Sequence, residues 1–509
     1  MRLRDHGPLI FFLLLATWAV WQAQYHPFFW DTVQLGAKHA DFFYTSDFSQ
    51  LLLPPEMDSG HPPLFGLYLA ACWQLFGATL PVSHWAMLPF LWGIVVLPFA
   101  LARHFGTPKT AWWLPLLVAA DPVMASQAVL VSPDVVLVFF FLLALWSIVK
   151  QKPVIQVIAI AGLALISMRG MMTAAMLFVW QFVFFSYKLR AASYEFGTPK
   201  PIWIRYLRLL SKQLLLFLPG GLLAGGWLVW HYLQTGWIGY HPDSPWALSF
   251  ERVGAEGIAR NGIILVWRLL DFGRIFVWAG VLFLLWQHRP KKAFFQNKMQ
   301  GQAVALLLLA LLFLTPTLLL YKALSAHRYL LPVFLALSLW LYAMAAQAPK
   351  HGLKIVLFSA VMLFAGNFWV YPQHIAQGWD ASLAHWPYYQ LRQQALDFIQ
   401  QENLPLDSIG TAFPEIGPLH YRDLSGFIDA GGTRGIRARD GISRQQRDGI
   451  SRQQYGFKTK DLDSDPYILW SNVMNDFSDA ERAALQKDWQ PMQRWKKGAV
   501  EMVLYRRGR

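Results

Sequence analysis

The side chains best placed to do chemistry are acids and bases at the ends of long apolar stretches. Asp31 directly follows the first such stretch, in the segment FFWDTVQLGAKHADFF, and is flanked by Phe29 and Trp30. An acid at the boundary of an apolar segment, beside aromatic rings, is a candidate general base because its surroundings can tune its basicity. The structural alternative is that Asp31 caps a helix beginning at Thr32.

A second candidate lies thirty residues further on, in GHPPLFGLYLAACWQLFG. Pro62 and Pro63 end any helix before them and favour the start of a new one, which places His61 at the mouth of that helix. Free backbone N–H groups and a partial positive charge suit a phosphate there, and a protonated His61 would add to them. As an isolated motif, HPP is weakly specific.

Two more polar sites follow at the ends of apolar stretches. Asp134 opens one in LVSPDVVLVFF, and the segment KALSAHRYLLP places three basic residues before another, namely Lys322, His327 and Arg328. Each site has a structural alternative: Asp134 would cap its helix, and the basic trio would anchor the chain at a membrane interface.

The segment TGWIGYHPDSPWALSFERV contains His241 and Asp243 among several aromatic residues. Aromatic faces stack on sugar rings, so this segment is a candidate acceptor-binding surface. An interfacial belt of Trp and Tyr explains the aromatic residues equally well.

Composition indicates which elements must position these residues. Of 509 residues, 55% are hydrophobic and only 15% are charged. Stretches such as 214–233 and 303–320 are long enough to cross about 30 Å of hydrocarbon, which indicates a polytopic α-helical membrane protein. The net charge of +14 comes mostly from short loops beside apolar segments, so it does not indicate a nucleic acid partner. A single cysteine, Cys72, excludes an internal disulfide and a Cys-based zinc site.

The distribution of basic residues decides the predicted topology. The chain has about eleven expected spans, near 8–25, 84–102, 111–131, 134–149, 153–168, 171–187, 213–233, 265–286, 302–320, 329–346 and 353–370. With the apolar segment 62–77 left in the outer interface, all the basic clusters fall on one side: Arg2/Arg4, Arg103/Lys109, Lys150/Lys152, 188–212, 289–298 and Lys350/Lys354. The N-terminus, an uncleaved first span, is then inside and the C-terminus outside. Arg328 falls on the outer side, against the usual bias, which favours a functional role for it.

We therefore expect a transmembrane domain over 1–370, with juxtamembrane helices at 32–77, and a small extracytoplasmic α/β domain over 371–509. The polar tail has a helical pattern at 388–401, a strand pattern at 467–471, a capped helix near Ser478 and a hairpin-like pattern at 492–506. The sequence RDGISRQQ at 439–446 is repeated unchanged at 447–454. We interpret this repeat as a replicated surface loop.

An Asp after the first span, HPPL thirty residues later, an SPD turn opening a span and a late RYLLP occur in this order in one superfamily. The chain resembles bacterial members of the dolichyl-phosphate-mannose–protein mannosyltransferase superfamily, which includes the lipid A aminoarabinose transferases. These are type C glycosyltransferases (GT-C). The resemblance covers roughly residues 8–346, and it is specific as a set although each motif is loose. Juxtamembrane helices between the first two spans are a feature of that fold.

The resemblance implies roles for individual residues. Asp31 matches the catalytic base, and Asp134 matches a second acid at the active site. His61 and Arg328 match basic residues near the donor phosphate, and Arg169, in SMRG, is a weaker match to a Lys-Gly pair. Two departures are visible: Thr32 follows Asp31 where many relatives have Glu, and His61 replaces the Lys of the aminoarabinose transferases. The second departure argues against their sugar and their lipid A acceptor.

These parts fit transfer of a sugar from a polyprenyl-phosphate donor at the outer face of a bacterial inner membrane, with inversion. Asp31 would take the proton of the acceptor hydroxyl. Cationic side chains would hold the departing phosphate, namely His61, Arg169, Lys322, His327 and Arg328. Asp134 would orient the acceptor or hold a divalent cation, and the sequence does not decide between these. The sugar and the acceptor, whether lipid, glycan or protein, are not identified.

Three other classes of protein remain. A transporter or flippase of lipid-linked sugars would commonly show internal repeats, and no repeat between the halves is evident. A polymerase or ligase using polyprenyl-diphosphate glycans would need a large late outer loop, whereas 234–264 is modest. The third class is a structural membrane protein with a sensory tail.

Overall fold

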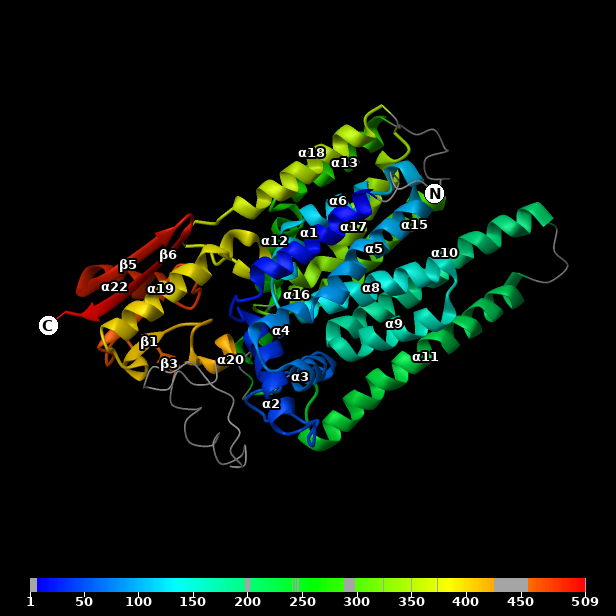
Figure 1. Ribbon diagram of the computed structural model, residues 1–509. Coiled ribbons are helices and arrows are strands. Elements are labelled where there is room, and N and C mark those ends of the chain that lie inside the picture. The colour runs from blue at the N-terminus through cyan, green and yellow to red at the C-terminus, as the bar shows by residue number, and fades with distance from the viewer. Residues whose placement is uncertain are drawn as a thin grey trace.

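The apolar stretches form helices that lie side by side in one bundle, and the polar tail forms an α/β domain at one end of it (Figure 1). This computed structural model describes residues 7–196, 202–239, 241–242, 244, 247–287, 298–323, 325–348, 350–372, 374–424 and 456–508. The helices of the bundle are α1 (Gly7–Ala23), α4 (Leu80–Trp85), α5 (Leu88–Phe105), α6 (Trp113–Ala120), α7 (Pro122–Ala128), α8 (Pro133–Lys150), α9 (Pro153–Ile166), α10 (Met168–Phe196), α11 (Ile202–Thr235), α12 (Ala255–Leu270), α13 (Arg274–Gln287), α15 (Lys298–Leu314), α16 (Pro316–Leu320), α17 (Leu331–Ala345) and α18 (Gly352–Ala365).

Within the described residues, six helices are long and apolar enough to cross a membrane, or seven crossings if the bent pair α12–α13 is taken as one. The predicted count of eleven spans is therefore not confirmed. Three of the predicted spans form the shorter apolar helices α1, α9 and α18. The span predicted over 111–131 is divided at Asp121, whose carboxylate accepts hydrogen bonds from the backbone N–H of Val123 (2.9 Å) and Met124 (3.2 Å) and so starts α7.

The apolar stretch predicted as a span over 265–286 is not one continuous helix. The chain breaks at residues 271–273, and α12 and α13 meet at 77°. Phe272 and Gly273 both have positive φ (49° and 83°), and a Cβ on Gly273 would lie 2.0 Å from the carbonyl oxygen of Met362. Hydropathy alone does not detect such a break, because the apolar residues of the two helices outweigh Arg268, Asp271 and Arg274 around it, and the pair still passes as hydrophobic enough to cross.

The helices expected within 32–77 are present at the end of the bundle that carries the α/β domain (Figure 1). They are the π-helix η2 (Val33–Lys38), α2 (His39–Thr45) and α3 (Leu64–Phe76). The last has only 13 residues, short for a membrane crossing. Gly66 brings α3 against α2, since a Cβ there would lie 2.8 Å from His39 Cβ and 3.1 Å from the ring of Phe43.

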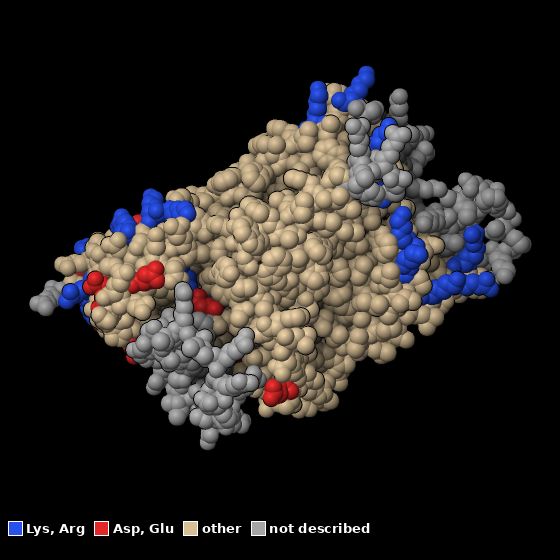
Figure 2. Space-filling model, viewed as in Figure 1, with Lys and Arg blue, Asp and Glu red and all other residues tan. Residues whose placement is uncertain are grey.

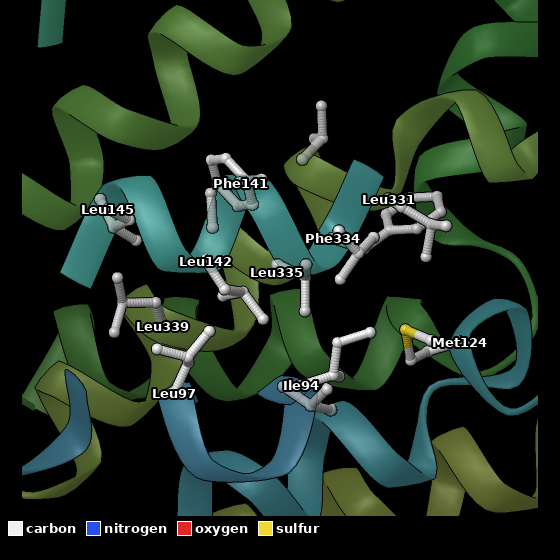
Figure 3. Packing of buried hydrophobic residues seen from close by; sticks show 14 of the residues in the cluster. Ile94, Leu97, Met124, Phe141, Leu142, Leu145, Leu331, Phe334, Leu335 and Leu339 are labelled. Atoms are coloured by element: carbon white, nitrogen blue, oxygen red, sulfur yellow. The ribbon is translucent and has the colours of Figure 1, made fainter. Parts of the chain in front are cut away.

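The centre of the bundle is the segment His327–Ala345, which ends in α17 and in which 89% of the apolar window is buried. Figure 3 shows Leu335 and Leu339 of α17 packed between α8, through Leu142, and α5, through Ile94 and Leu97. A helix enclosed on all sides has little freedom to rotate or slide, because protein interiors are close-packed. The short 3₁₀ helix η5 (His327–Leu330), which leads into α17, is therefore held in a fixed position.

The tail folds largely as its sequence predicts. Helix α19 (Pro387–Gln401), strand β4 (Tyr467–Ser471), helix α22 (Asp479–Asp488) with its Ser478 capping box, and the β5–β6 hairpin (Trp489–Lys497, Val500–Arg507) confirm the four expected elements. The sheet has the order β2-β3-β1-β4-β6-β5 and also contains β1 (Ile409–Thr411), β2 (Gly417–Pro418) and β3 (Gly456–Thr459). Strand β1 is parallel to both β3 and β4. The RDGISRQQ repeat at 439–454 lies outside the described residues.

The α/β domain packs against the segment that precedes Asp31. The backbone N–H of Phe28 donates to the carbonyl of Arg422, in α20 (His420–Asp423), at 2.9 Å. The ring of His26 stacks on Tyr389 of α19, with ring centroids 4.1 Å apart. The turns η7 (Trp379–Ala381) and η8 (Leu383–His385), which link α18 to α19, lie against α7 of the bundle. The first part of the tail is therefore integral to the junction between the two parts of the chain.

Charge is distributed unevenly along the bundle. Figure 2 shows Lys and Arg gathered at the end where the N-terminus, α10 and α11 lie, charge of both signs on the α/β domain, and a broad uncharged surface between them. Such a belt is what a protein embedded in a bilayer presents to the lipid tails.

We predict that Lys152 and Lys350 face the cytoplasm and that the tail from Tyr371 lies outside, because basic loops are retained inside. The test is labelling of single cysteines with a membrane-impermeant reagent, in a Cys72→Ala background. The variants Lys152→Cys and Lys487→Cys replace exposed residues at opposite ends of the molecule. In intact cells Lys487→Cys should be labelled and Lys152→Cys should not; the reverse pattern would invert the topology.

Candidate active site

Asp31 lies in a tight turn after α1 that leaves its carboxylate available. Trp30 has a positive φ of 57°. The hydroxyl of Thr32 accepts a hydrogen bond from the backbone N–H of Phe29 (3.0 Å) and donates to the carbonyl of the same residue (2.7 Å). Thr32 therefore closes the turn, and the Asp31 carboxylate forms an ion pair with Arg328. In this structure Asp31 is directed at a cation.

The carboxylate of Asp134 does not cap its helix either. It is the second residue of α8, and the side chain of Ser132 accepts the hydrogen bond from its backbone N–H (3.1 Å). Both carboxylate oxygens of Asp134 meet arginines instead: Oδ1 lies 2.7 Å from Arg169 Nη1, and Oδ2 lies 3.3 Å from Arg328 Nε. Asp134 thus joins the two arginines.

Arg169 reaches Asp134 from the start of α10, just after a sharp turn between α9 and α10. Ser167 caps this turn by accepting from the backbone N–H of Gly170 (3.1 Å). Gly170 is required there, since a Cβ would lie 2.0 Å from the carbonyl oxygen of Leu163. The Arg169 guanidinium lies 4.0 Å from the centroid of the Tyr329 ring, a cation–π contact that also orients it.

Arg328 is the centre of the cluster. Its guanidinium forms ion pairs with Asp31 through Nη2, with Asp134 through Nε and with Asp380 through Nη1. The guanidinium of an arginine presents five N–H donors in a rigid planar fork, so it can serve three carboxylates in fixed directions. Asp31 and Arg328 are 297 residues apart in the sequence, so this contact is a product of the fold. We call Asp31, Asp134, Arg169, Arg328 and Asp380 the acid–arginine cluster.

Asp380, in η7, was not predicted as a site residue. Its side chain is only 3% exposed. Burial raises the pKa of Asp380 to about 6; Arg328 opposes this effect, and the neighbouring Asp31 and Asp134 add to it. The sequence around it, QGWDASLAHW, contains an unusual Gly-Trp-Asp step in the polar tail. That step belongs to none of the motifs that carry the resemblance.

His61 lies near this cluster but is not the cation that the sequence suggested. It lines a cavity of about 20 Å³ together with Asp134 and Arg169, room for about one water molecule. Burial lowers the pKa of His61 to about 4, with Arg169 lowering it further, so the ring is neutral at neutral pH. Its Nδ1 is buried and has no hydrogen-bond partner among the described residues. A neutral imidazole in this position offers a hydrogen bond to a ligand.

His241 supports the loop that carries His61. Its Nε2 donates to the carbonyl of Asp58 at 3.3 Å, and its ring packs on Trp237. The carboxylate of Asp58 lies 2.8 Å from Nε2 of His231 and also accepts the backbone N–H of Gly60 at 2.7 Å. His241 is 5% exposed, so it contributes little to any acceptor-binding surface. Asp243 lies outside the described residues.

Two of the expected phosphate-binding residues are engaged elsewhere. His327 is buried against Asp271, with Nε2 and Oδ2 2.7 Å apart, in the break between α12 and α13. Lys322 forms an exposed ion pair with Glu251 at 2.8 Å. Their described ion pairs do not include the carboxylates of the acid–arginine cluster.

The break that holds His327 is itself an ionic network. The hydroxyl of Tyr371 donates to Asp271 and accepts from Arg268 at 2.6 Å. Arg274, on the far side of the break, forms a bidentate pair with Asp121 at 3.1 and 2.7 Å. Because Asp121 starts α7, this pair ties together the two broken spans of the bundle. The network fixes the residue immediately before Arg328.

Among the described residues, no group of three or more His, Cys, Asp or Glu side chains is arranged to hold a metal ion. Both oxygens of Asp134 are paired with arginines. A divalent cation at Asp134, one of the two roles left open by the sequence, would have to displace a guanidinium.

The arrangement of the helical bundle and the α/β domain can be compared with that of known proteins. No family model and no curated protein matches the chain. Two crystal structures do: ArnT from Cupriavidus metallidurans bound to undecaprenyl phosphate (TM-score 0.52, 14% identity) and the same protein in the apo state (TM-score 0.50, 13% identity), each with 98% of both chains covered. The chain has the fold of ArnT, an aminoarabinose transferase, and the resemblance seen in the sequence is confirmed at that level.

We predict that Arg328→Ala strongly destabilises the protein, because it leaves three carboxylates without their shared counter-ion. Breaking a buried ion pair from one side costs about 3–5 kcal/mol. The measurement is thermal unfolding of the detergent-purified protein. Lys322→Ala is the matched control, because its pair is exposed and such pairs contribute about 0–1 kcal/mol. Equal unfolding temperatures for the two variants would contradict the central role of Arg328.

Proposed function

We propose that this protein is a membrane glycosyltransferase that transfers a sugar from a polyprenyl-phosphate donor to an acceptor hydroxyl at the outer face of a bacterial inner membrane. The observation that carries the proposal is the convergence of Asp31, Asp134, Arg169 and Arg328. They come from four separate regions of the chain and meet at the junction with the α/β domain. The ArnT structure that shares this fold is bound to undecaprenyl phosphate, a polyprenyl phosphate.

The exposure of the cluster indicates where the donor enters. The side chains of Asp31 and Arg169 are 18% and 19% exposed, whereas those of Asp134, Arg328 and Asp380 are between 3% and 6% exposed. A phosphate arriving from outside therefore meets Arg169 and the Asp31 side of Arg328. Arginine suits this role because its fork binds phosphate oxygens in a bidentate manner.

Asp31 changes partner in the proposed reaction. While it is paired with Arg328, its carboxylate is occupied by the guanidinium and is not available to an acceptor hydroxyl. A donor phosphate that takes the Nη2 side of Arg328 releases Asp31, which then accepts the proton of the acceptor hydroxyl as that oxygen attacks the anomeric carbon. The leaving group is a phosphate monoester stabilised by Arg328 and Arg169, so no general acid is needed. A single displacement inverts the anomeric centre.

His61 and Asp134 complete the proposed site. The unpartnered Nδ1 of His61 is available to a donor oxygen, and Asp134 fixes Arg169 at 2.7 Å so that both guanidinium groups face one ligand. His327, Lys322 and His241 hold surrounding structure in this proposal and do not touch the donor. This chain has His61 where the aminoarabinose transferases have Lys before the two prolines. If that residue selects the sugar, the sugar transferred here differs from theirs.

The function is tested by comparing the surface glycans and glycoproteins of a deletion strain with those of its parent by mass spectrometry. We expect one sugar mass to disappear and to return when the wild-type gene is restored. Unchanged glycans and glycoproteins, in a strain that normally makes the protein, would refute the proposed transfer.

Asp31→Asn should reduce sugar transfer by about 10²-fold or more, because it keeps the size of the side chain while removing its basicity. Transfer is measured as return of the missing sugar mass per amount of membrane-inserted protein. The matched control is Asp47→Asn, a change of the same chemistry at an exposed residue of the same outer segment. Near-normal transfer by Asp31→Asn would exclude Asp31 as the base.

A further inference from the structure

Asp380 is held rigidly in the acid–arginine cluster by contacts from both parts of the chain. Its backbone carbonyl accepts a hydrogen bond from Gln127 Nε2 of α7 at 2.9 Å. Gln377, three residues earlier, is also held from two sides. Its backbone carbonyl accepts a hydrogen bond from the side chain of Asn475 in the α/β domain (2.7 Å), and its side-chain oxygen accepts one from the backbone N–H of Tyr371 (2.8 Å). These bonds fix the backbone at Asp380, and the ion pair with Arg328 orients its carboxylate.

The cluster contains three carboxylates and two guanidinium groups. If all are ionised, it carries one net negative charge. The donor of the proposed function is a phosphodiester, which carries another negative charge at any physiological pH. Four anionic groups would then share two cations in a mostly buried site, where unbalanced charge costs several kcal/mol. Donor binding requires that one acid lose its charge.

Asp380 is the acid best placed to do so. Asp31 must stay ionised to act as the base. Asp134 has two arginine partners, at 2.7 and 3.3 Å, and is therefore the most firmly held anion. Asp380 has one arginine partner and a side chain only 3% exposed. Burial already raises the pKa of Asp380 to about 6, so a further anion nearby moves it into the neutral range.

The described elements that pack against η7 present no other group that would take up this proton on donor binding. Helix α7 presents Gln127, which does not titrate, and its capping Asp121 is bound to Arg274. Segment η5 presents Arg328, and His327 beside it is paired with Asp271. Helix α19 presents Tyr389, whose pKa is raised by burial, so its hydroxyl stays protonated. Turn η8 presents His385, and burial lowers the pKa of its ring to about 4, so the ring stays neutral.

We propose that Asp380 is the charge-balancing residue of the donor site: its carboxylate takes one proton from water when the anionic donor binds and returns it when the site empties. The inference rests on the proposed function. The protonated carboxyl still accepts a hydrogen bond from Arg328 through its carbonyl oxygen. Arg328 keeps its position while Asp31 is exchanged for the phosphate. Asp380 acts through Arg328 and does not touch the donor.

The test is donor-site affinity as a function of pH, from about pH 5 to about pH 8. The probe is the methyl ester of undecaprenyl phosphate, a phosphodiester that keeps a single charge over this range. Wild-type protein should bind it most tightly below about pH 6 and lose about tenfold in affinity by about pH 8, because a one-unit rise in the pKa of Asp380 on binding corresponds to a factor of ten. Asp380→Asn is permanently neutral and should bind with the wild-type low-pH affinity at every pH.

Two controls separate this role from a merely structural one. Asp380→Glu keeps a titratable group and should keep the pH slope, and Glu251→Gln, a change at an exposed carboxylate, should leave it unaltered. Parallel profiles for wild type and Asp380→Asn would overturn the inference. Absence of probe binding by the wild type at every pH would instead count against the proposed function.

A measurement on the wild type alone covers the case in which Asp380→Asn fails to fold. Calorimetric titration of the same probe, in buffers of different ionisation enthalpy near pH 7, reports the protons exchanged on binding. We expect net uptake of about half a proton per probe bound, because a rise in the pKa of Asp380 from about 6 to about 7 raises its protonated fraction at pH 7 from about 0.1 to about 0.5. Binding without proton uptake would overturn the role of Asp380 even though the site accepts the phosphodiester.

Discussion

The bundle and the α/β domain meet around the guanidinium of one buried arginine. Arg328 is contacted by acids from the turn after α1, from the start of α8 and from the segment after α18. Buried ions are tolerated only when they are paired, so pairing with Arg328 favours the packing of all three regions around it. The cluster is therefore a condition on the whole fold as well as the proposed site of chemistry.

Several charged side chains of the bundle lie at helix ends, and two of its apolar stretches contain a break that forms such ends. The division between α6 and α7 and the 77° bend between α12 and α13 give up regular backbone hydrogen bonds inside an apolar bundle. Such breaks persist in a membrane protein only when other groups satisfy the freed backbone and side chains. Arg274 does this for both, since it binds Asp121 and lies 3.6 Å from Asp271. Arg328 lies in η5, directly before the enclosed helix α17, and is therefore held at one level along the bundle axis.

The sequence identified Asp31, Asp134 and Arg328 because they belong to an ordered set of motifs, and Arg169 through a weaker match. These four residues do meet. The sequence could not identify Asp380, a single acid in a polar tail whose partner is 52 residues away. It assigned a charge to His61 because burial is invisible in a sequence, and the buried ring is neutral. The elements of the tail were predictable from periodicity and capping residues, whereas the number of spans was not. Positive φ at Phe272 and Gly273 breaks a helix whose mean hydropathy, even with Asp271 and Arg274 beside the break, is still that of a membrane crossing.

The origin of Asp380 has a consequence for biosynthesis. A ribosome releases the chain from its N-terminus, so Asp31, Asp134, Arg169 and Arg328 are all made before the segment that follows α18. Helices inserted up to that moment hold an arginine pocket that lacks one of its three acids. The site reaches its final electrostatic state only when the tail has docked on the segment before Asp31. Completion of the site is therefore coupled to the folding and docking of the tail, and a chain truncated after α18 would lack the third acid of the cluster.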